Sequence, residues 1–526
     1  MKPYPLYSYQ KLDTLREVVD WCSGLYGHQS AFVWRTGKTI QNRDYSEFRT
    51  DVIHLCSFLK KFHGKNGHIS ILGENSYIWI VAYIASAYGG LVSVPLDKDM
   101  PPKEVEEKLT ASDSDVLILS DTYADYSEAV GKLGIQIVLF SEIEAFLADS
   151  AGKEIENVLD PLSGETLASI VFTSGTTGKS KGVMLTQKNL TSDIHAAACN
   201  VSLLGSGILV LPLHHTFGST AALLAAMYTG RSIFINRSLR TIAADLKAAA
   251  PTHLFAVPLL VETLYKNIWN TARKTGKENA LHRLISISEM LRKVRIDLRR
   301  ILFRRIINEL GGNLKLIVSG GAPLSDKLVR GFDQLGIIVL NGYGITECSP
   351  IVAVNRNHFN IVGSVGLPLI CNEVKIAADG EVLVRGENVM KGYYRNEIET
   401  AECIRDGWLY TGDLGRIDQN GALHIIGRKK NLIILSNGEN IAAEEIEELI
   451  LEKIGYVAEV IVTGSSEGIQ AECYLAPNQM DLSSRIDQDI AALNKQLPPS
   501  KRVTKVLLRD TEFPKTTTKK IKRGEY

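Results

Sequence analysis

Short apolar runs that suit β-strands alternate with helical patterns along most of the chain, and this alternation limits the folds open to it. Apolar strands that alternate with helices form mostly parallel sheets covered by helices on both faces, so the sequence predicts an α/β fold. Ligands of such folds bind at loops after the carboxyl ends of strands, which directs attention to the loops after Leu213, Val318 and Leu340. The strand-like runs are residues 68–73, 91–96, 115–120, 135–140, 208–213, 231–236, 253–258, 314–319 and 337–344.

The pattern changes near residue 363, where short strands joined by tight turns begin. Turn dipeptides at 379–380 and 420–421 separate such strands, and they predict a β-rich part over about 363–427. Helices and strands mix again beyond that part. We therefore expect the main domain boundary near residues 429–431.

Composition excludes several classes of protein. The 526 residues are 45% hydrophobic and carry a formal net charge of +0, which gives no reason to expect a nucleic-acid partner. The seven cysteines are scattered singly without a CxxC pair, so we expect neither a zinc site nor a disulfide framework. The N-terminal residues lack the apolar core of a signal peptide, and a cytoplasmic location is expected.

One stretch, residues 78–96, carries no charge and is long enough to span a bilayer. Gly89 and Gly90 divide it and Pro95 ends it, so a buried helix followed by a strand explains the pattern better. We therefore expect no integral membrane segment.

Residues 290–306 predict an amphipathic helix. The apolar face carries Leu291, Val294, Leu298 and Ile301. The basic face carries Arg292, Arg295 and Arg299. Such a helix either packs against the protein with its charges in solvent or lies on an anionic membrane, and peripheral membrane contact is left open.

A loop rich in Thr, Ser, Gly and Lys joins two strand-like runs in IVFTSGTTGKSKGVMLT, residues 170–186. Glycines let backbone N–H groups approach a phosphate closely, and hydroxyl groups and Lys179 add donors and positive charge. The loop is not a Walker A motif, because Thr173 stands where that motif has its first glycine and because a second strand follows. The helix begins later, with Thr186 as N-cap. The pattern predicts a phosphate-binding hairpin.

The loop TSGTTGKSKG closely resembles the signature loop of the adenylate-forming enzymes, which include acyl-CoA synthetases, peptide-synthetase adenylation domains and beetle luciferases. Further motifs of that family follow in the family's order, and together they cover essentially the whole chain. They are LPLHHTFG (211–218), SGGAPL (319–324), GYGITE (342–347), YTGD (410–413), GRKKN (427–431) and PKTTTKKIKR (514–523). Within the family, PLDKDMP and SNGENI look most like bacterial medium- and long-chain fatty-acyl-CoA synthetases.

This resemblance implies a large N-terminal domain, residues 1–429, with two α/β subdomains and the β-rich one, followed by a small mobile α/β domain, residues 430–526. It implies an ATP-dependent enzyme that joins a medium- or long-chain fatty acid to CoA through an acyl-adenylate and releases AMP and pyrophosphate. Mg²⁺ is the implied metal. Two alternatives stay open: a stand-alone ligase that loads an aryl, amino or fatty acid onto a separate carrier protein, and a non-catalytic family member.

The resemblance also assigns nucleotide contacts. The β- and γ-phosphates would contact Thr173, Ser174, Gly175, Thr176, Thr177, Gly178 and Lys179. The adenine pocket would include Gly321, Ala322, Asn341, Gly342 and Tyr343. Thr346 would contact the α-phosphate, Asp413 both ribose hydroxyls, and Arg428 the ribose and phosphates. Glu347 would be the Mg²⁺ ligand together with Thr173, since this hard cation takes few oxygen ligands from protein.

Lys520 resembles the family's catalytic lysine, which bridges the substrate carboxylate and the α-phosphate. Lys519 precedes it where the family has a glycine, so this chain departs from the pattern there. Lys430 matches the hinge about which the C-terminal domain rotates, and the rotation would withdraw Lys520 before the thiol enters.

His215 matches the histidine at the entrance of the acyl pocket. Ser319 and Gly320 would lie along that pocket, and Gly438 matches a glycine beside the channel for the CoA pantetheine. His214 is expected to be structural. No zinc site is expected at the two histidines, because neighbours on a strand point to opposite faces.

Overall fold

The computed structural model describes residues 4–61, 66–153, 159–173, 180–434, 440–465, 468–515, 521 and 523. The chain divides into two compact units: the larger holds Met1–Glu373 and Arg385–Gly407, and the smaller holds Val374–Val384 and Trp408–Tyr526. None of the points at which the chain passes from one unit to the other falls at the predicted boundary, because residues 381–384 pair with a strand that begins at Trp408. The boundary near residue 430 stays a prediction.

The first sheet of the larger unit has the strand order β18-β8-β7-β4-β3-β5-β6. Its strands are β3 (His68–Leu72), β4 (Val92–Leu96), β5 (Val116–Leu119), β6 (Gln136–Leu139), β7 (Leu167–Thr173), β8 (Lys181–Thr186) and β18 (Gly392–Tyr393). Strands β3 to β7 run parallel where they pair, whereas β8 is antiparallel to both β7 and β18. The sequence thus correctly predicted a parallel sheet and a second strand after the Thr/Gly-rich loop.

Helix α3 (Tyr77–Tyr88) is buried along its whole length and leads into β4. This confirms the prediction of a helix followed by a strand over residues 78–96. Across the part of the chain that the structure describes, no helix combines the length and apolarity needed to cross a membrane.

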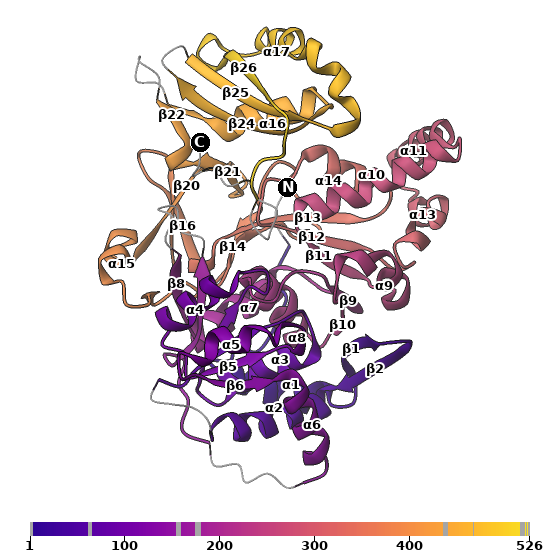
Figure 1. Ribbon diagram of the computed structural model, residues 1–526. Helices are drawn as coiled ribbons and strands as arrows, with labels where there is room; N and C mark the ends of the chain where they lie inside the picture. The colour runs from indigo at the N-terminus through magenta and orange to yellow at the C-terminus, as the bar shows by residue number, and fades with distance from the viewer. Residues whose placement is uncertain are drawn as a thin grey trace. The chain divides into compact units, whose positions relative to one another are not determined.

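The second sheet of the larger unit has the order β15-β14-β13-β12-β11-β9-β10-β1-β2. Its strands are β1 (Ser30–Thr36), β2 (Thr39–Asp44), β9 (Ser206–Leu209), β10 (Ser232–Ile235), β11 (His253–Ala256), β12 (Leu316–Ser319), β13 (Ile338–Gly344), β14 (Ile351–Val354) and β15 (Leu367–Pro368). Its central strands are parallel, and antiparallel strands complete it at both edges. Figure 1 shows β11, β12 and β13 beside one another, with α14 and α10 nearby.

Helices accompany both sheets, as expected for strands that alternate with helices. They are α1 (Leu15–Tyr26), α2 (Tyr45–Leu59), α4 (Pro102–Ala111), α5 (Tyr126–Gly131), α6 (Phe140–Ser150), α7 (Gln187–Asn200), α8 (Ala225–Tyr228), α9 (Ile242–Ala249), α10 (Pro258–Lys274), α11 (Glu278–Lys293), α12 (Arg299–Leu302), α13 (Arg304–Glu309), α14 (Asp326–Gln334) and α15 (Glu397–Cys403). A π-helical segment, Phe217–Leu224, precedes α8.

The prediction of a single amphipathic helix over residues 290–306 is wrong. Helix α11 ends at Lys293, Arg295 has a left-handed φ of 64°, and two short helices follow. Asp333 of α14 accepts hydrogen bonds from both Arg292 and Arg299, each at 2.9 Å. These two arginines hold the bend against α14 and therefore do not form a free basic face.

The smaller unit contains a β-rich part and a C-terminal α/β part. The β-rich part pairs β17 (Glu381–Gly386), β20 (Trp408–Ile417) and β21 (Leu423–Arg428) in antiparallel fashion. β16 (Asn372–Ile376) lies beside β17, and β19 (Ile404–Arg405) precedes β20. Gly380 and Gly421 have positive φ at the predicted turns, so these short strands and their turns are confirmed.

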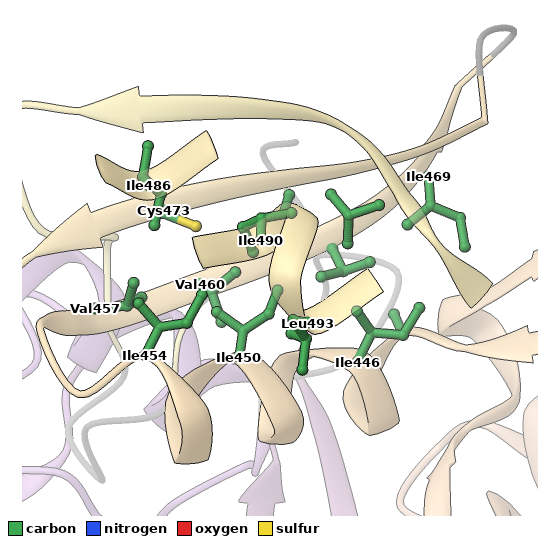
Figure 2. Close-up of a cluster of buried hydrophobic side chains, with 14 of the residues drawn as sticks. Ile446, Ile450, Ile454, Val457, Val460, Ile469, Cys473, Ile486, Ile490 and Leu493 are labelled. Carbon is green, nitrogen blue, oxygen red and sulfur yellow. The ribbon is translucent and has the colours of Figure 1, made fainter. Parts of the chain in front are cut away.

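The C-terminal part stacks two helices on a three-stranded sheet. Its elements are β22 (Leu432–Ile434), β23 (Asn440–Ala442), α16 (Ala443–Lys453), β24 (Val457–Ser465), β25 (Gly468–Leu475), α17 (Ile486–Asn494) and β26 (Val503–Arg509). Figure 2 shows Ile446 and Ile450 on the inner face of α16, and Ile454 directly after the helix, directed at Val460 and Leu493. Their spacing of four residues is that of one helix face, and this face forms the core of the part.

Candidate active site

The predicted phosphate-binding hairpin is the turn between β7 and β8, where Thr173 pairs with Lys181. Its tip, residues 174–179 with Ser174, Gly175, Thr176, Thr177, Gly178 and Lys179, lies outside the described residues. Thr186 caps α7 through its side chain, which accepts a hydrogen bond from Asn189 N at 3.1 Å, as the sequence predicted. A loop between antiparallel strands is not a Walker A loop, because that loop feeds directly into a helix.

Lys181 ties the base of this hairpin to residues 393–399. Its Nζ forms an ion pair with Glu399 and lies 5.0 Å from the centre of the Tyr393 ring. Tyr393 belongs to β18, which pairs directly with β8. The strand that leaves the phosphate loop is therefore fixed by backbone pairing, by charge and by a cation over an aromatic face.

Glu347 lies in a short 3₁₀ turn, Thr346–Cys348, after β13. The Tyr393 hydroxyl donates a hydrogen bond to Glu347 Oε1 at 2.9 Å, and Met390 N donates to the Glu347 carbonyl at 2.8 Å. The turn needs a glycine at its start, since a Cβ at Gly344 would lie 2.1 Å from the Pro350 carbonyl oxygen. Both the backbone and the carboxylate of Glu347 are thus held in place.

The residues predicted for the adenine pocket meet at the carboxyl ends of two neighbouring parallel strands. Ser319 at the end of β12 pairs with Asn341 of β13. Gly320, Gly321 and Ala322 continue from β12, and Gly342 and Tyr343 continue along β13. The buried Ser319 Oγ and Asn341 Oδ1 have no hydrogen-bond partner among the described residues. Buried polar atoms are normally satisfied, so these two suit a polar ligand or water.

His215 lies in a turn before the π-helical segment, so the prediction that His214 and His215 share a strand is wrong. Strand β9 ends at Leu209, and the Asn75 side chain bonds the backbone of Leu211 and Leu213 instead, at 2.8 and 3.2 Å. The two histidine rings are 4.1 Å apart, not on opposite faces.

Burial lowers the pKa of His214 to about 4, so its contact with Asp97, 3.5 Å away, joins a neutral imidazole to a carboxylate at neutral pH. Phe217 follows His215 by two residues, and its ring lies 3.5 Å from the position of a Cβ at Gly320. The Phe217 ring therefore packs beside Gly320, one of the residues predicted for the acyl pocket.

In the smaller unit, Asp413 and Arg428 pair across β20 and β21, and Arg428 Nε donates to Asp413 Oδ1 at 2.7 Å. Asp413 is only 3% exposed, and its backbone N–H bonds Thr411 Oγ1 at 3.1 Å. Glu381 supports the same turn, since it accepts hydrogen bonds from Gly412 N and Lys429 Nζ. This arrangement presents a buried carboxylate beside a cation.

Lys430 lies in a 3₁₀ turn directly after β21, and burial lowers its pKa, with Arg428 and Arg523 adding to the effect. Gly438 and Lys520 lie outside the described residues. The residues that flank Lys520 are described: Lys515 and Ile521 pair as a bridge, and Arg523 forms an ion pair with Glu447 of α16. The predicted catalytic loop is thus closed at its base.

Comparison with known proteins identifies the family of this chain. The family model described as AMP-binding enzyme matches residues 21–394. The chain belongs to the AMP-binding enzyme family. The prediction of an adenylate-forming enzyme is therefore confirmed.

Several relatives of this AMP-binding enzyme have names that state an activity. It is 30% identical over 431 residues to long-chain-fatty-acid–CoA ligase FadD15 of Mycobacterium bovis, covering 76% of this chain and 71% of the relative. It is 29% identical over 499 residues to long-chain-fatty-acid–CoA ligase 5 of Rattus norvegicus, covering 85% and 71%. These names agree with the predicted ligase class and do not favour the carrier-protein alternative.

Its fold matches that of solved structures. O-succinylbenzoate coenzyme A synthetase from Bacillus subtilis, solved with ATP and a magnesium ion, has a TM-score of 0.74 at 22% identity, with 96% of this chain and 98% of that chain covered. The predicted α/β fold class is confirmed.

Sequence reasoning missed the residues that hold the predicted site. Tyr393, Glu399, Asn75 and Glu447 each contact a predicted residue or its segment. Each of them lies far along the chain from its partner, so strand and helix periodicity carry no trace of the contact.

The residues predicted to bind Mg²⁺ would form an oxygen site rather than a preformed cage. Within residues 4–61, 66–153, 159–173, 180–434 and the shorter described ranges, no cluster of three or more His, Cys, Asp or Glu could hold a metal ion. Glu347 supplies a fixed carboxylate at the surface of the strand-end region, and Thr173 supplies a half-buried hydroxyl. One or two protein oxygens completed by phosphates and water are the usual set for Mg²⁺, so the donors present fit this metal.

Proposed function

We propose that this protein is a cytoplasmic, ATP-dependent acyl-CoA synthetase that activates a medium- or long-chain fatty acid through an acyl-adenylate. It then transfers the acyl group to CoA and releases AMP and pyrophosphate. The names of relatives aligned over most of the chain support this substrate class. The observation that carries the proposal is the Glu347 carboxylate, fixed by Tyr393 beside the strand that leaves the phosphate hairpin.

The larger unit supplies the contacts to the triphosphate and adenine. Residues 173–179 hold the β- and γ-phosphates, and Thr346 contacts the α-phosphate. Gly321, Ala322, Asn341, Gly342 and Tyr343 form the adenine pocket. Support comes from the meeting of β12 and β13 at their carboxyl ends, where α/β sheets bind nucleotides.

Glu347 and Thr173 would hold Mg²⁺, which when bound neutralises charge on the phosphates as the fatty-acid carboxylate approaches. The carboxylate attacks the α-phosphorus, the bond to the pyrophosphate oxygen breaks, and acyl-AMP forms. Lys520 offsets the repulsion between the two anions. Because Glu347 is already held by Tyr393, little reorganisation is needed at this step.

The smaller unit supplies Asp413 for both ribose hydroxyls and Arg428 for the ribose and phosphates. The ion pair of Arg428 with Asp413 orients that carboxylate before the nucleotide binds. Rotation at Lys430 then withdraws Lys520 and admits the thiol past Gly438. The thiol attacks the acyl carbon, and AMP leaves.

His215, Ser319 and Gly320 line the acyl pocket. The ring of Phe217 beside Gly320 would give the pocket an apolar wall, which suits an alkyl chain better than a charged amino acid.

ATP–pyrophosphate exchange across acids from acetate to palmitate, with aryl and amino acids included, tests the proposal. Exchange that is strongest with medium or long fatty acids, followed by CoA ester formation, is expected. Transfer to a phosphopantetheinylated carrier protein but not to CoA would establish the carrier ligase instead. Exchange with no acid, together with no thermal shift by ATP, would establish a non-catalytic protein.

The exposed side chains of α11 and α12 form the surface at which we place peripheral contact with an anionic bilayer. Apolar side chains between residues 287 and 301 are 44–70% exposed: Ile287, Met290, Val294, Ile296 and Ile301. Residues 283–305 contain eight basic and two acidic residues, and Lys293, Arg295 and Arg304 are exposed. Exposed apolar groups among basic ones match a surface of anionic lipid headgroups over acyl chains.

Sedimentation with phosphatidylglycerol vesicles tests this contact. Wild type should sediment, and Val294→Ser with Ile301→Ser should lower binding roughly tenfold because two apolar anchors are lost. Leu204→Ser, at a position 56% exposed elsewhere in the larger unit, is the matched control and should change nothing. Equal binding by the double variant, or by neutral vesicles, would contradict the contact.

A further inference from the structure

Tyr393 and Glu347 form a closed contact in the larger unit. The Tyr393 hydroxyl lies 2.9 Å from Glu347 Oε1, although the two residues are far apart in sequence. Tyr393 is only 7% exposed, so water does not compete freely for this bond. Among the residues that the structure describes, no donor contacts Glu347 Oε2.

The ring of Tyr393 is fixed from several sides. Its backbone N–H donates to Thr400 Oγ1 at 2.8 Å, and Lys181 Nζ lies over the ring at 5.0 Å. Lys181 is itself held by Glu399 of α15. Gly392 before it has φ 144°, and a Cβ there would lie 2.8 Å from Thr400 Cγ2, so the backbone passes very close to that side chain.

The phenol is the donor in this contact, since its hydroxyl donates to Glu347 Oε1. A hydroxyl that donates to one carboxylate oxygen fixes the orientation of that carboxylate and leaves the other oxygen for a second partner.

We propose that Tyr393 is the positioning residue of Glu347: its hydroxyl holds Oε1 and would leave Oε2 available to a divalent cation, and Lys181 with Glu399 locks the ring. The proposal rests on the proposed function, since Glu347 matters here as the ligand of Mg²⁺. Partners that orient a metal ligand typically change metal affinity by about 10- to 100-fold when removed. A purely structural tyrosine would not change the metal dependence.

Tyr393→Phe removes only the hydroxyl and keeps the ring under Lys181. The Mg²⁺ concentration for half-maximal ATP–pyrophosphate exchange should rise about tenfold, and excess Mg²⁺ should restore most of the rate. Tyr394→Phe is the matched control: its hydroxyl also bonds a carboxylate, Asp113, at 2.7 Å, but not the one at the site. The control should keep the wild-type Mg²⁺ dependence within twofold.

A binding measurement separates this inference from activity. Mn²⁺ titrations followed by electron paramagnetic resonance, with α,β-methylene-ATP present, should show about tenfold weaker Mn²⁺ binding in Tyr393→Phe and unchanged binding in Tyr394→Phe. Unchanged Mn²⁺ affinity in Tyr393→Phe would overturn the inference. If Tyr393→Phe does not fold, Lys181→Met should give a smaller weakening in the same direction, and no weakening would again overturn it.

The two proposals fail differently. If wild type catalyses no exchange with any acid, the proposed function fails, while the Mn²⁺ titrations still decide the role of Tyr393. If wild type is active and Tyr393→Phe loses rate without any change in Mg²⁺ or Mn²⁺ dependence, the tyrosine is structural and only the further inference fails.

Discussion

The two compact units hold the residues proposed for nucleotide binding by different means. In the larger unit these residues lie at strand ends, where close backbone approaches and a neutral donor, Tyr393, fix Glu347. In the smaller unit the corresponding residues are held by ion pairs, Asp413 with Arg428 and Glu447 with Arg523. The larger part should therefore respond to changes in shape, and the smaller part to changes in charge and salt.

The buried titratable groups differ in the same way. His214 in the larger unit is kept neutral, because burial lowers its pKa to about 4. Glu447 in the smaller unit has its pKa raised to about 7 by burial, although Arg523 opposes the rise. The two units should therefore lose stability in opposite directions as pH changes.

The largest effect should come from Lys520→Ala. Acyl-AMP formation should fall roughly 10²- to 10³-fold, because a positioned charge at the reacting anions is lost, while thioester formation from supplied acyl-AMP should persist. Lys519→Ala is the matched control and should leave both steps near wild type. Equal loss of both steps in Lys520→Ala would contradict the division of labour between the units.

His214→Gln should remove an acid-labile element from the larger unit. The folded pKa of His214 is about 4 against an ordinary 6.5, so its contribution is present above pH 6.5 and is lost as pH falls toward 4. The loss is about 3 kcal/mol for a shift of this size. The protection of residues 211–218 from hydrogen exchange, corrected for intrinsic rates, should weaken as the pH falls in wild type. It should weaken much less in the variant.

Glu447→Gln should show the opposite sign in the smaller unit. The pKa of Glu447 is raised from 4.5 to about 7, so its contribution is complete below pH 4.5 and is lost as pH rises through 7. Protection of α16 should therefore fall between pH 5 and 8 in wild type and stay level in the variant. A protection that rises with pH would show that Arg523 outweighs burial.

Asp413→Asn should raise KM for ATP about tenfold, since a charged acceptor for the ribose is lost beside Arg428. Asp418→Asn is the control, because Asp418 also pairs with a basic side chain of β21, His424, at 3.2 Å. An unchanged KM in Asp413→Asn would remove the smaller unit from nucleotide recognition.

Sequence predicted what local signals encode. Thr186 as N-cap, the second strand after the phosphate loop, and the helix and strand of residues 78–96 all follow from capping and periodicity within a short window. The break at Arg295 was not predicted, because Asp333 of α14 draws Arg292 and Arg299 together across the bend. Periodicity cannot register such a tertiary contact.

The candidate site shows the same difference between features that local motifs predict and contacts between distant residues. Motifs placed Ser319 and Asn341 on strands that prove to be neighbours, and they singled out Asp413 and Arg428, which the structure pairs across two strands. The contacts that orient the site, Tyr393 with Glu347 and Arg523 with Glu447, join residues distant in the chain. The roles assigned to the site residues remain predictions, and Lys520 and Gly438 also lie outside the described residues.

The smaller unit takes one strand from the middle of the chain, residues 374–384, and the rest from residue 408 onward. A ribosome releases that strand well before its partner β20, at roughly 5–20 residues per second, so β17 waits unpaired for a second or more. The larger unit must likewise wait for Arg385–Gly407 before it is complete. Synthesis of the two units is therefore interleaved. A ribosomal pause between residues 385 and 408 would prolong the exposure of the unpaired edge of β17.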